Sequence, residues 1–162
     1  MTIDDIRSLY AYNAWANQRI FESIGQLTSP QIAQPLGGSF SSIRDTVAHI
    51  VFAEWLWLRR WKGESPRAQP DWVKGDITSL REKLTAIERE LAEFIESLSD
   101  DQLPQTRTIT DMSGKTYGRR LGDMLVHVAN HATYHRGQVA TMTRQVGGTP
   151  VSTDFNRFVS DR

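Results

Sequence analysis

The chain has 162 residues, a length that predicts a single domain over residues 1–162. Its 19 Lys and Arg are balanced by 19 Asp and Glu, so it lacks the positive surplus that nonspecific binding to nucleic acid or to an anionic membrane requires, and we expect neither partner. The absence of cysteine excludes disulfides and thiolate metal ligands. The chain has no run of about 20 apolar residues, which excludes a membrane-spanning helix. Because Asp4-Asp5 gives the start an acidic character where a signal peptide is basic, we expect a cytoplasmic protein.

The first predicted helix runs from Ile3 to Leu27, where apolar residues recur in steps of three and four. Asn13 and Asn17 occupy two positions of this apolar stripe. Because the stripe of a bundle helix faces the core, we expect polar groups of this helix to lie inside the protein.

The second predicted helix follows Gly37-Gly38 and extends to about Trp61. Ser42 and Asp45 are spaced as a capping box at its start. The segment from Val47 to Leu58 is nearly apolar around its circumference, so we expect this helix to be the most buried one.

Two further helices and a hairpin complete the pattern. A regular stripe from Ile77 to Leu98 predicts the third helix, after a loop at Gly63–Gly75. The fourth extends from Leu121 to about Val146, and we interpret Arg119-Arg120 as its solvated start. The segment from Thr106 to Tyr117 contains a turn-like sequence and predicts a hairpin. Together these segments predict an all-α fold, a four-helix bundle with a short β-hairpin before the last long helix.

The four histidines are candidate metal ligands, and three of them recur in steps of four on the last helix. His127 and His135 would lie about 12 Å apart along the helix axis, too far to share one ion. Helical rotation places His131 and His135 toward the apolar face and His127 at its edge. His49 lies in the middle of the apolar second helix, so it can supply a third imidazole.

A site of three imidazoles suits Zn²⁺ or Ni²⁺, whereas Mg²⁺ and Ca²⁺ prefer oxygen ligands. Three protein ligands leave a coordination position open, which is typical of catalytic rather than structural zinc sites. The alternative to a metal ligand is a buried histidine whose hydrogen bonds are satisfied by the protein. We favour this alternative for His127, which lies at the edge of the apolar face or supports one of the ligand histidines. The candidates for orienting the ligand imidazoles are Asn13, Asn17, Asp45 and Glu54.

Four segments of the chain carry a family pattern: Asp45–Ile50 (DTVAHI), Asn130–Gln138 (NHATYHRGQ), Tyr12–Asn17 (YNAWAN) and Gly38–Ile43 (GSFSSI). In these segments the chain resembles the DinB family of bacterial damage-inducible proteins, over nearly its whole length. The resemblance implies an up-down-down-up four-helix bundle with a long crossover, usually a homodimer, that holds one divalent ion. The family's ligand positions map onto His49, His131 and His135, the same trio that rotation and burial select.

The resemblance also implies a function, because characterised relatives include thiol-dependent transferases and isomerases. We therefore expect a metal-dependent transferase that joins a low-molecular-weight thiol to an electrophilic small molecule. Two alternatives remain: a hydrolase that uses metal-bound water, and a noncatalytic metal-binding or stress-response interaction protein. We expect the thiol to contact Asn13, Asn17 and Arg136. We expect the apolar walls of the site to come from Ile50, Phe52 and Leu56.

Aromatic and basic residues gather near the end of the second helix, at Trp55, Trp57, Trp61 and Arg59-Arg60. Because the spacing distributes them around the helix, we interpret them as core packing and dimer contact rather than as a stacking platform for nucleic acid. We therefore expect a homodimer formed through helix faces.

Overall fold

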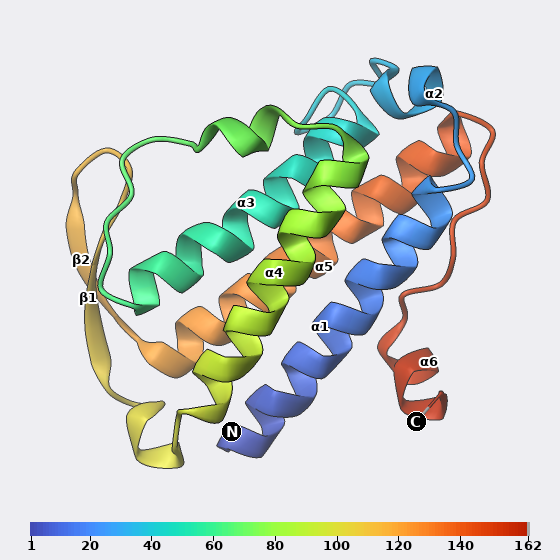
Figure 1. Cartoon of the computed structure of the whole chain (residues 1–162). Coiled ribbons are helices and arrows are strands. Elements are labelled where there is room, and N and C mark those ends of the chain that lie inside the picture. Colours follow the sequence, from blue (N-terminus) through green and yellow to red (C-terminus); the bar gives the residue numbers. More distant parts are fainter. Residues whose placement is uncertain (162) are drawn as a thin grey trace.

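Four long helices form the body of the protein in a computed structural model that describes residues 1–161. They are α1 (Ile3–Ile24), α3 (Ile43–Trp61), α4 (Ile77–Glu96) and α5 (Leu121–Gln145). In Figure 1, α1 and α5 run upward while α3 and α4 run downward, and the crossover from α3 to α4 returns along the outside of the bundle. The up-down-down-up order with a long crossover is therefore confirmed.

Shorter elements connect the long helices. α2 (Ser29–Ala33) follows α1, and the 3-10 helix η1 (Asp71–Lys74) lies in the crossover. A second 3-10 helix, η2 (Asp100–Gln102), precedes the strands β1 (Thr106–Thr110) and β2 (Thr116–Arg120). A last helix, α6 (Phe155–Ser160), which the sequence pattern did not predict, closes the described chain.

The start of α3 is set by its N-cap. The Ser42 hydroxyl accepts a hydrogen bond from the Asp45 backbone N–H at 3.1 Å, as expected of the first half of a capping box. The second half is not made, because the Asp45 carboxylate accepts hydrogen bonds from Ser41 and Arg44 instead. Ser42 therefore fixes the beginning of the helix that carries His49.

The core lies between four helices that pack in a closed ring, with α1 and α3 each in contact with both α4 and α5. α3 has 13 buried residues out of 19, against 11 of 22 in α1 and 11 of 25 in α5. The expectation that the second predicted helix is the most buried is confirmed. Most of the predicted stripe of α4 is buried as well, at Leu80, Leu84, Ile87 and Leu91, while Ile77 and Phe94 are partly buried and Ile95 takes the last buried position of the helix.

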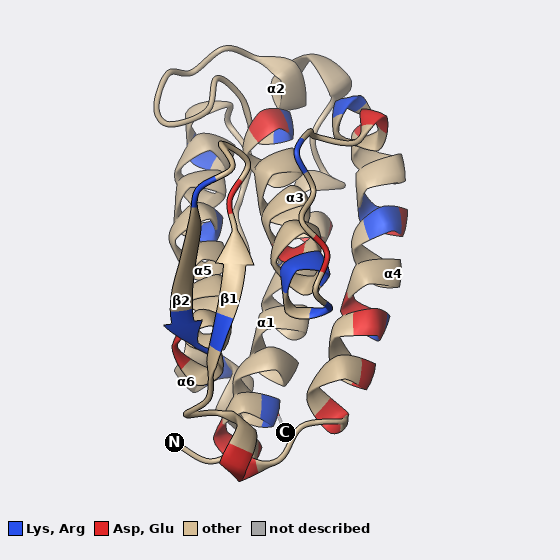
Figure 2. Ribbon diagram, turned by 90° about the vertical axis from the view of Figure 1, so that its left-hand side faces the viewer, with Lys and Arg blue, Asp and Glu red and all other residues tan. Residues whose placement is uncertain are grey.

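The hairpin forms where the sequence predicts it and is longer than expected. Its strands are antiparallel, and Thr106 pairs with Arg120 at the open end. Arg119 and Arg120 therefore belong to β2 rather than to the start of the last helix, which begins at Leu121. The side view shows the hairpin standing beside the bundle, with the basic end of β2 in its arrowhead (Figure 2). Ile109, which is 3% exposed, anchors it to the core.

The tryptophans of α3 make their contacts within the chain. The Trp55 ring lies 5.9 Å from that of Trp72, and Trp61 stacks on Phe94 at 5.8 Å. Core packing is thus confirmed for these residues. Trp55 and Trp57 pack against the core but are only half-buried.

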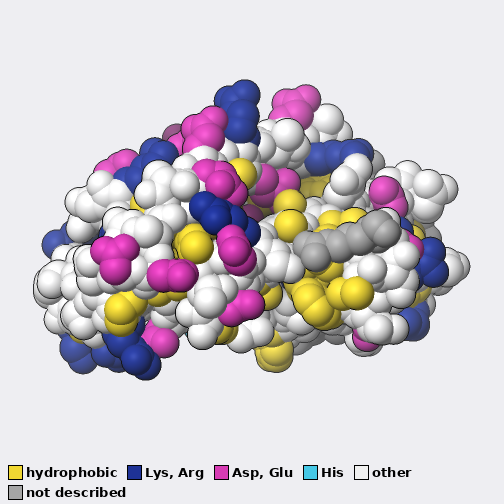
Figure 3. Space-filling model, turned by 90° about the horizontal axis from the view of Figure 1, so that it is seen from below, with side chains coloured by type: hydrophobic (Ala, Val, Ile, Leu, Met, Phe, Trp, Pro, Cys, Tyr) yellow, Lys and Arg dark blue, Asp and Glu magenta, His cyan; other side chains and the backbone are white. Residues whose placement is uncertain are grey.

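Charges of both signs are interspersed on the face seen in Figure 3, in line with the balanced composition. Within residues 1–161, the helices contain no segment of the length and apolar character that crossing a bilayer requires.

Candidate metal centre

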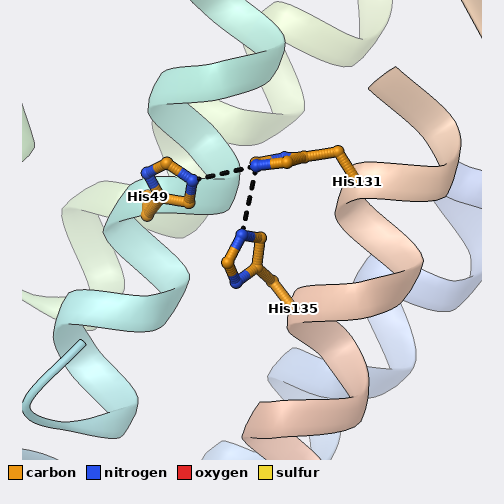
Figure 4. Close-up of side chains that lie close together, drawn as sticks. All are labelled: His49, His131 and His135. Carbon is orange, nitrogen blue, oxygen red and sulfur yellow. Dashed lines mark hydrogen bonds between the residues drawn. The ribbon is translucent and has the colours of Figure 1, made fainter. Parts of the chain in front are cut away.

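Two helices bring three histidines together. α3 contributes His49, and α5 contributes His131 and His135, which lie one turn apart on the same face (Figure 4). The rings point toward one another across the space between α3 and α5. The trio predicted from sequence is therefore assembled in the fold.

The nitrogen atoms of the trio converge on one another. Nε2 of His131 lies 3.1 Å from Nε2 of His49 and 3.1 Å from Nε2 of His135. One ligand atom from each of the three residues lies within 4.8 Å of the other two. Two ligands of a tetrahedral Zn²⁺ with Zn–N distances of 2.0–2.1 Å are about 3.3 Å apart, so the spacing fits a shared ion.

The hydrogen bond of His135 fixes which of its nitrogens can bind a metal. Its Nδ1 atom lies 2.7 Å from the Oε1 atom of Gln138, and the Gln138 amide nitrogen donates to the Ser39 hydroxyl at 3.1 Å. Because Oε1 only accepts, Nδ1 carries the proton, and the Nε2 atom of the neutral ring keeps its lone pair toward the centre of the trio. This is the support that metal-ligating histidines ordinarily have.

Burial keeps two of the imidazoles uncharged. Burial, with smaller contributions from the neighbouring His135 and His131, lowers the pKa of His49 to about 4. Burial likewise lowers the pKa of His131 to about 4, with His135 and His127 as the next contributions. At neutral pH both rings are therefore neutral, the form in which imidazole binds a metal ion.

Aromatic side chains cover the trio. Phe40 stacks on His49 with ring centroids 4.3 Å apart and meets His135 edge-on at 5.5 Å. Tyr134, which is exposed, lies 5.0 Å from the His135 ring. Of the residues expected to form apolar walls, Phe52 stacks on Trp55 at 5.9 Å, and no described ring contact joins it to the histidines. Ile50 and Leu56 are buried in the core.

His127 stays outside the cluster, as the rotation argument predicts. Its ring lies 5.8 Å from that of His131 and 5.4 Å from that of Trp57, and the side chain is exposed. Across residues 1–161, only His49, His131 and His135 form a group with metal-ligand spacing.

A second polar cluster occupies the middle of the bundle and joins all four long helices. Arg136 donates hydrogen bonds to the side-chain oxygens of Asn13 at 2.6 Å and Asn17 at 2.8 Å. The Asn13 and Asn17 amides donate to Glu54 Oε1 at 2.8 and 2.9 Å, and Asn17 also donates to Glu88 at 3.0 Å. We call these five residues the buried polar cluster.

This cluster corrects several expectations. Asn13, Asn17, Glu54 and Arg136 are each at most 2% exposed and bind one another, and the hydrogen bonds described for residues 1–161 do not join them to the histidines. Asp45 likewise binds Ser41 and Arg44. These side chains therefore do not orient the imidazoles through direct hydrogen bonds. Asn13, Asn17 and Arg136 therefore offer almost no exposed surface to a thiol.

Burial disfavours charge throughout this cluster. Burial and the neighbouring Glu54 raise the pKa of Glu88 to about 8, against the opposing effects of the hydrogen bond from Asn17 and of Arg136. Burial raises the pKa of Glu54 and lowers that of Arg136. One positive side chain faces two carboxylates, so a proton on Glu88 brings the cluster to neutrality.

Sequence reasoning missed Gln138 and Phe40. Gln138 had a signal, because it lies three residues after His135 and so on the same helix face. Phe40 lies in the family segment Gly38–Ile43, but helical periodicity could not place it, since it precedes α3 in a loop whose path depends on the positive φ angles of Gly37 (75°) and Gly38 (115°).

Solved structures share this fold. A DinB-like protein from Bacillus cereus superposes with a TM-score of 0.66 at 19% identity, covering 93% of this chain and 97% of that one. A conserved protein from Enterococcus faecalis gives 0.69 at 16% identity, covering 90% and 98%. At these identities the likeness concerns the fold.

Sequence comparisons identify the family. The chain is 28% identical over 167 residues to Protein DinB of Bacillus subtilis, covering 93% of this chain and 91% of that protein. It is 23% identical over 146 residues to the uncharacterized protein YizA of the same species, covering 90% and 91%. The profile of the DinB family matches residues 2–161. This chain therefore belongs to the DinB family.

Proposed function

We propose that the protein binds one divalent metal ion at His49, His131 and His135 and acts as a transferase that joins a low-molecular-weight thiol to an electrophilic small molecule. The observation that carries the proposal is the convergence of the three Nε2 atoms, with both His131 distances at 3.1 Å. In the absence of a shared cation, three lone-pair-bearing nitrogens at this spacing have too few protons to satisfy one another.

The donor set favours Zn²⁺ or Ni²⁺. The group of residues with metal-ligand spacing contains three imidazoles and no carboxylate among residues 1–161. Imidazole suits these borderline ions, whereas Mg²⁺ and Ca²⁺ prefer oxygen ligands. Three protein ligands also leave room for a ligand from solution.

The chain's own residues would prepare the reaction in three ways. A bound divalent ion would supply the positive charge that lowers the pKa of a coordinated thiol. Gln138 holds His135 in the tautomer that binds, and Phe40 shields two of the three rings from water. In the transfer, the thiol sulfur forms a bond to the electrophilic carbon, the leaving group departs with its bonding electrons, and the thiol proton passes to solvent.

The absence of cysteine agrees with this proposal, because the thiol has to come from solution. Support for thiol chemistry comes otherwise from the family resemblance. The experiment that tests it must therefore separate thiol transfer from the other reactions that an accessible metal ion supports.

Metal-loaded protein should be incubated with 1-chloro-2,4-dinitrobenzene and a panel of small thiols, with His135→Ala as the control. We expect thioether formation above the control for at least one thiol. Ester or amide hydrolysis without thiol transfer would replace the transferase with a hydrolase. A protein that binds metal but catalyses neither reaction would be a noncatalytic metal-binding or interaction protein.

The homodimer remains a prediction that rests on the family resemblance. Exposed apolar side chains available for such a contact include Tyr134, at 62%, and Phe155, at 48%. Light scattering at micromolar concentration should give twice the mass of one chain. A monomer mass would remove this prediction without affecting the metal site.

A further inference from the structure

A groove of about 500 Å³ lies beside the histidine trio. Its lining comes from α3, β2 and the first two turns of α5: Trp57, Tyr117, Arg119, Asp123, Met124 and His127. We call it the hairpin groove. Its volume is that of a small-molecule site, and its two aromatic side chains and one thioether provide an apolar floor.

The hairpin groove adjoins the candidate metal centre through His127. The His127 ring contacts Trp57 on one side, at 5.4 Å, and lies 5.8 Å from the His131 ring on the other. A molecule that fills the groove therefore extends to within one side chain of a proposed metal ligand.

Arg119, which lines the groove, and Arg60, which lies against the lining residue Trp57, have no ion pair among residues 1–161. Arg119 stacks on Tyr117 at 5.1 Å, and its described hydrogen bond goes to the carbonyl of its own neighbour Gly118. Arg60 stacks on Trp57 at 5.0 Å, is only 8% exposed, and its Nε atom lacks a hydrogen-bond partner. The buried Arg60 guanidinium is costly unless an anion lies near it, whereas the exposed Arg119 guanidinium is free to meet an anion from solution.

The acidic residues nearby do not remove this excess of positive charge. Asp123 lines the groove but forms an ion pair with Arg120 at 2.9 Å. Asp111 attracts Arg60 from the hairpin turn, where its carboxylate accepts backbone hydrogen bonds from Ser113 and Lys115. Figure 2 shows the basic end of β2 on this side of the bundle. The groove thus combines flat apolar walls with unpaired positive charge.

We propose that the hairpin groove binds a small carboxylate-bearing molecule with a flat apolar body, whose carboxylate meets Arg119 and whose body packs on Trp57 and Tyr117. This inference rests on the proposed function and deepens it, because it gives one of the two reactants a carboxylate. The electrophile and the thiol are the two possible carriers of that group.

The test uses trans-cinnamate and its neutral analogue cinnamamide, which share one flat shape and differ in charge. Binding is measured by nuclear magnetic resonance from the indole N–H signals of the five tryptophans, with the Trp57 signal assigned by Trp57→Phe. We expect cinnamate to shift the Trp57 signal and to bind at least about tenfold more tightly than cinnamamide, as a charge-assisted hydrogen bond allows.

Two variants localise the carboxylate. Arg119→Gln should weaken cinnamate binding about tenfold and leave cinnamamide binding unchanged. Lys115→Gln removes the same charge from the same exposed hairpin at a residue that does not line the groove, so it should change neither affinity. Equal affinities for the two probes, or an Arg119→Gln variant that binds cinnamate normally, would overturn the proposal.

A third variant separates the groove from the metal centre. His135→Ala should keep cinnamate binding within about twofold, because the groove does not need the ion. Loss of binding in this variant would place the carboxylate on the metal and overturn the groove assignment. The two proposals can also fail separately. If wild-type protein fails to bind a metal ion but still binds cinnamate normally, the proposed function is wrong and the groove assignment holds.

Competition in metal-loaded protein identifies the carrier of the carboxylate. If it belongs to the thiol, 3-mercaptopropionate should displace cinnamate where 2-mercaptoethanol does not. If it belongs to the electrophile, 4-chloro-3-nitrobenzoate should displace cinnamate where the corresponding benzamide does not. Failure of both carboxylates to compete would overturn the link between the groove and the reaction.

Discussion

The Nδ1 atom of His135 lies 2.7 Å from the Oε1 atom of Gln138, one turn further along α5. This contact holds the His135 imidazole in the tautomer whose Nε2 atom can bind a metal ion. Gln138→Leu should therefore weaken metal binding by about 10- to 100-fold, as loss of a partner that orients a ligand ordinarily does.

Titration of both proteins with Zn²⁺ and a competing chelator measures this effect. Gln145→Leu is the matched control, because Gln145 is an exposed glutamine two turns later on the same helix. Equal affinities for wild type and Gln138→Leu would show that the contact does not support the ligand.

The identity of the ligands can be tested one histidine at a time. His49→Ala, His131→Ala and His135→Ala should each greatly reduce the content of metal, which in wild type should be about one ion per chain. His127→Ala should retain it, because its ring lies outside the trio. Elemental analysis of the four purified variants decides the matter, and metal loss in His127→Ala with retention in His49→Ala would reverse the assignment.

Arg136 should be important for stability. Its replacement by Met leaves the Asn13 and Asn17 oxygens without a donor and the Glu54 carboxylate without a counter-charge, so the free energy of unfolding should fall by about 3–5 kcal/mol. Urea denaturation followed by circular dichroism measures it. Arg144→Met, at an exposed position of the same helix, should change the value by no more than about 0.5 kcal/mol.

Glu88 should make stability depend on pH. Its pKa rises from an ordinary 4.5 to about 8 in the folded protein, so the unfolded chain gives up its proton first as the pH rises. The contribution of Glu88 to stability is therefore complete below about pH 4.5 and is lost as the pH rises toward 8.

Glu88→Gln keeps an acceptor for Asn17 and removes the titrating proton. Relative to wild type, this variant should gain at least about 1 kcal/mol of unfolding free energy between pH 5 and pH 8.5. Denaturant unfolding of both proteins at the two pH values gives the difference. The same difference at both pH values would show that Glu88 is ionised throughout.

Removal of the metal should destabilise the protein only modestly. The apolar core is continuous through all four long helices and does not depend on the trio. A chelator should therefore lower Tm by a few degrees while the far-ultraviolet circular dichroism is retained. Complete unfolding would indicate a structural metal site.

The positions of the long helices and of the histidine trio could be predicted because they follow from local periodicity. A step of four on one helix already decides that His131 and His135 share a face, and the apolar surroundings of His49 direct it inward. The hairpin could also be predicted from local sequence, because a turn-like segment lies between threonines that favour strands.

The partners of the buried asparagines could not be predicted. Periodicity places Asn13 and Asn17 toward the core, but it does not say which side chain from another helix meets them. That depends on how four helices are rotated against one another, and here the rotation brings in Arg136 and Glu88 rather than the histidines. Phe40 escaped prediction because its position depends on loop geometry rather than on a repeat.

The buried polar cluster also bears on the order in which the chain can fold. The hydrogen bonds of Arg136 reach back 123 residues to Asn13 and 119 residues to Asn17. Contacts of such sequence separation carry a large loop-closure cost and ordinarily form late. During synthesis, the side-chain oxygens of Asn13 and Asn17 have no Arg136 donor until the ribosome has released most of α5, whereas their amide groups can already meet Glu54 and Glu88. The buried polar cluster is therefore completed only near the end of translation, when its one positive side chain reaches the two carboxylates.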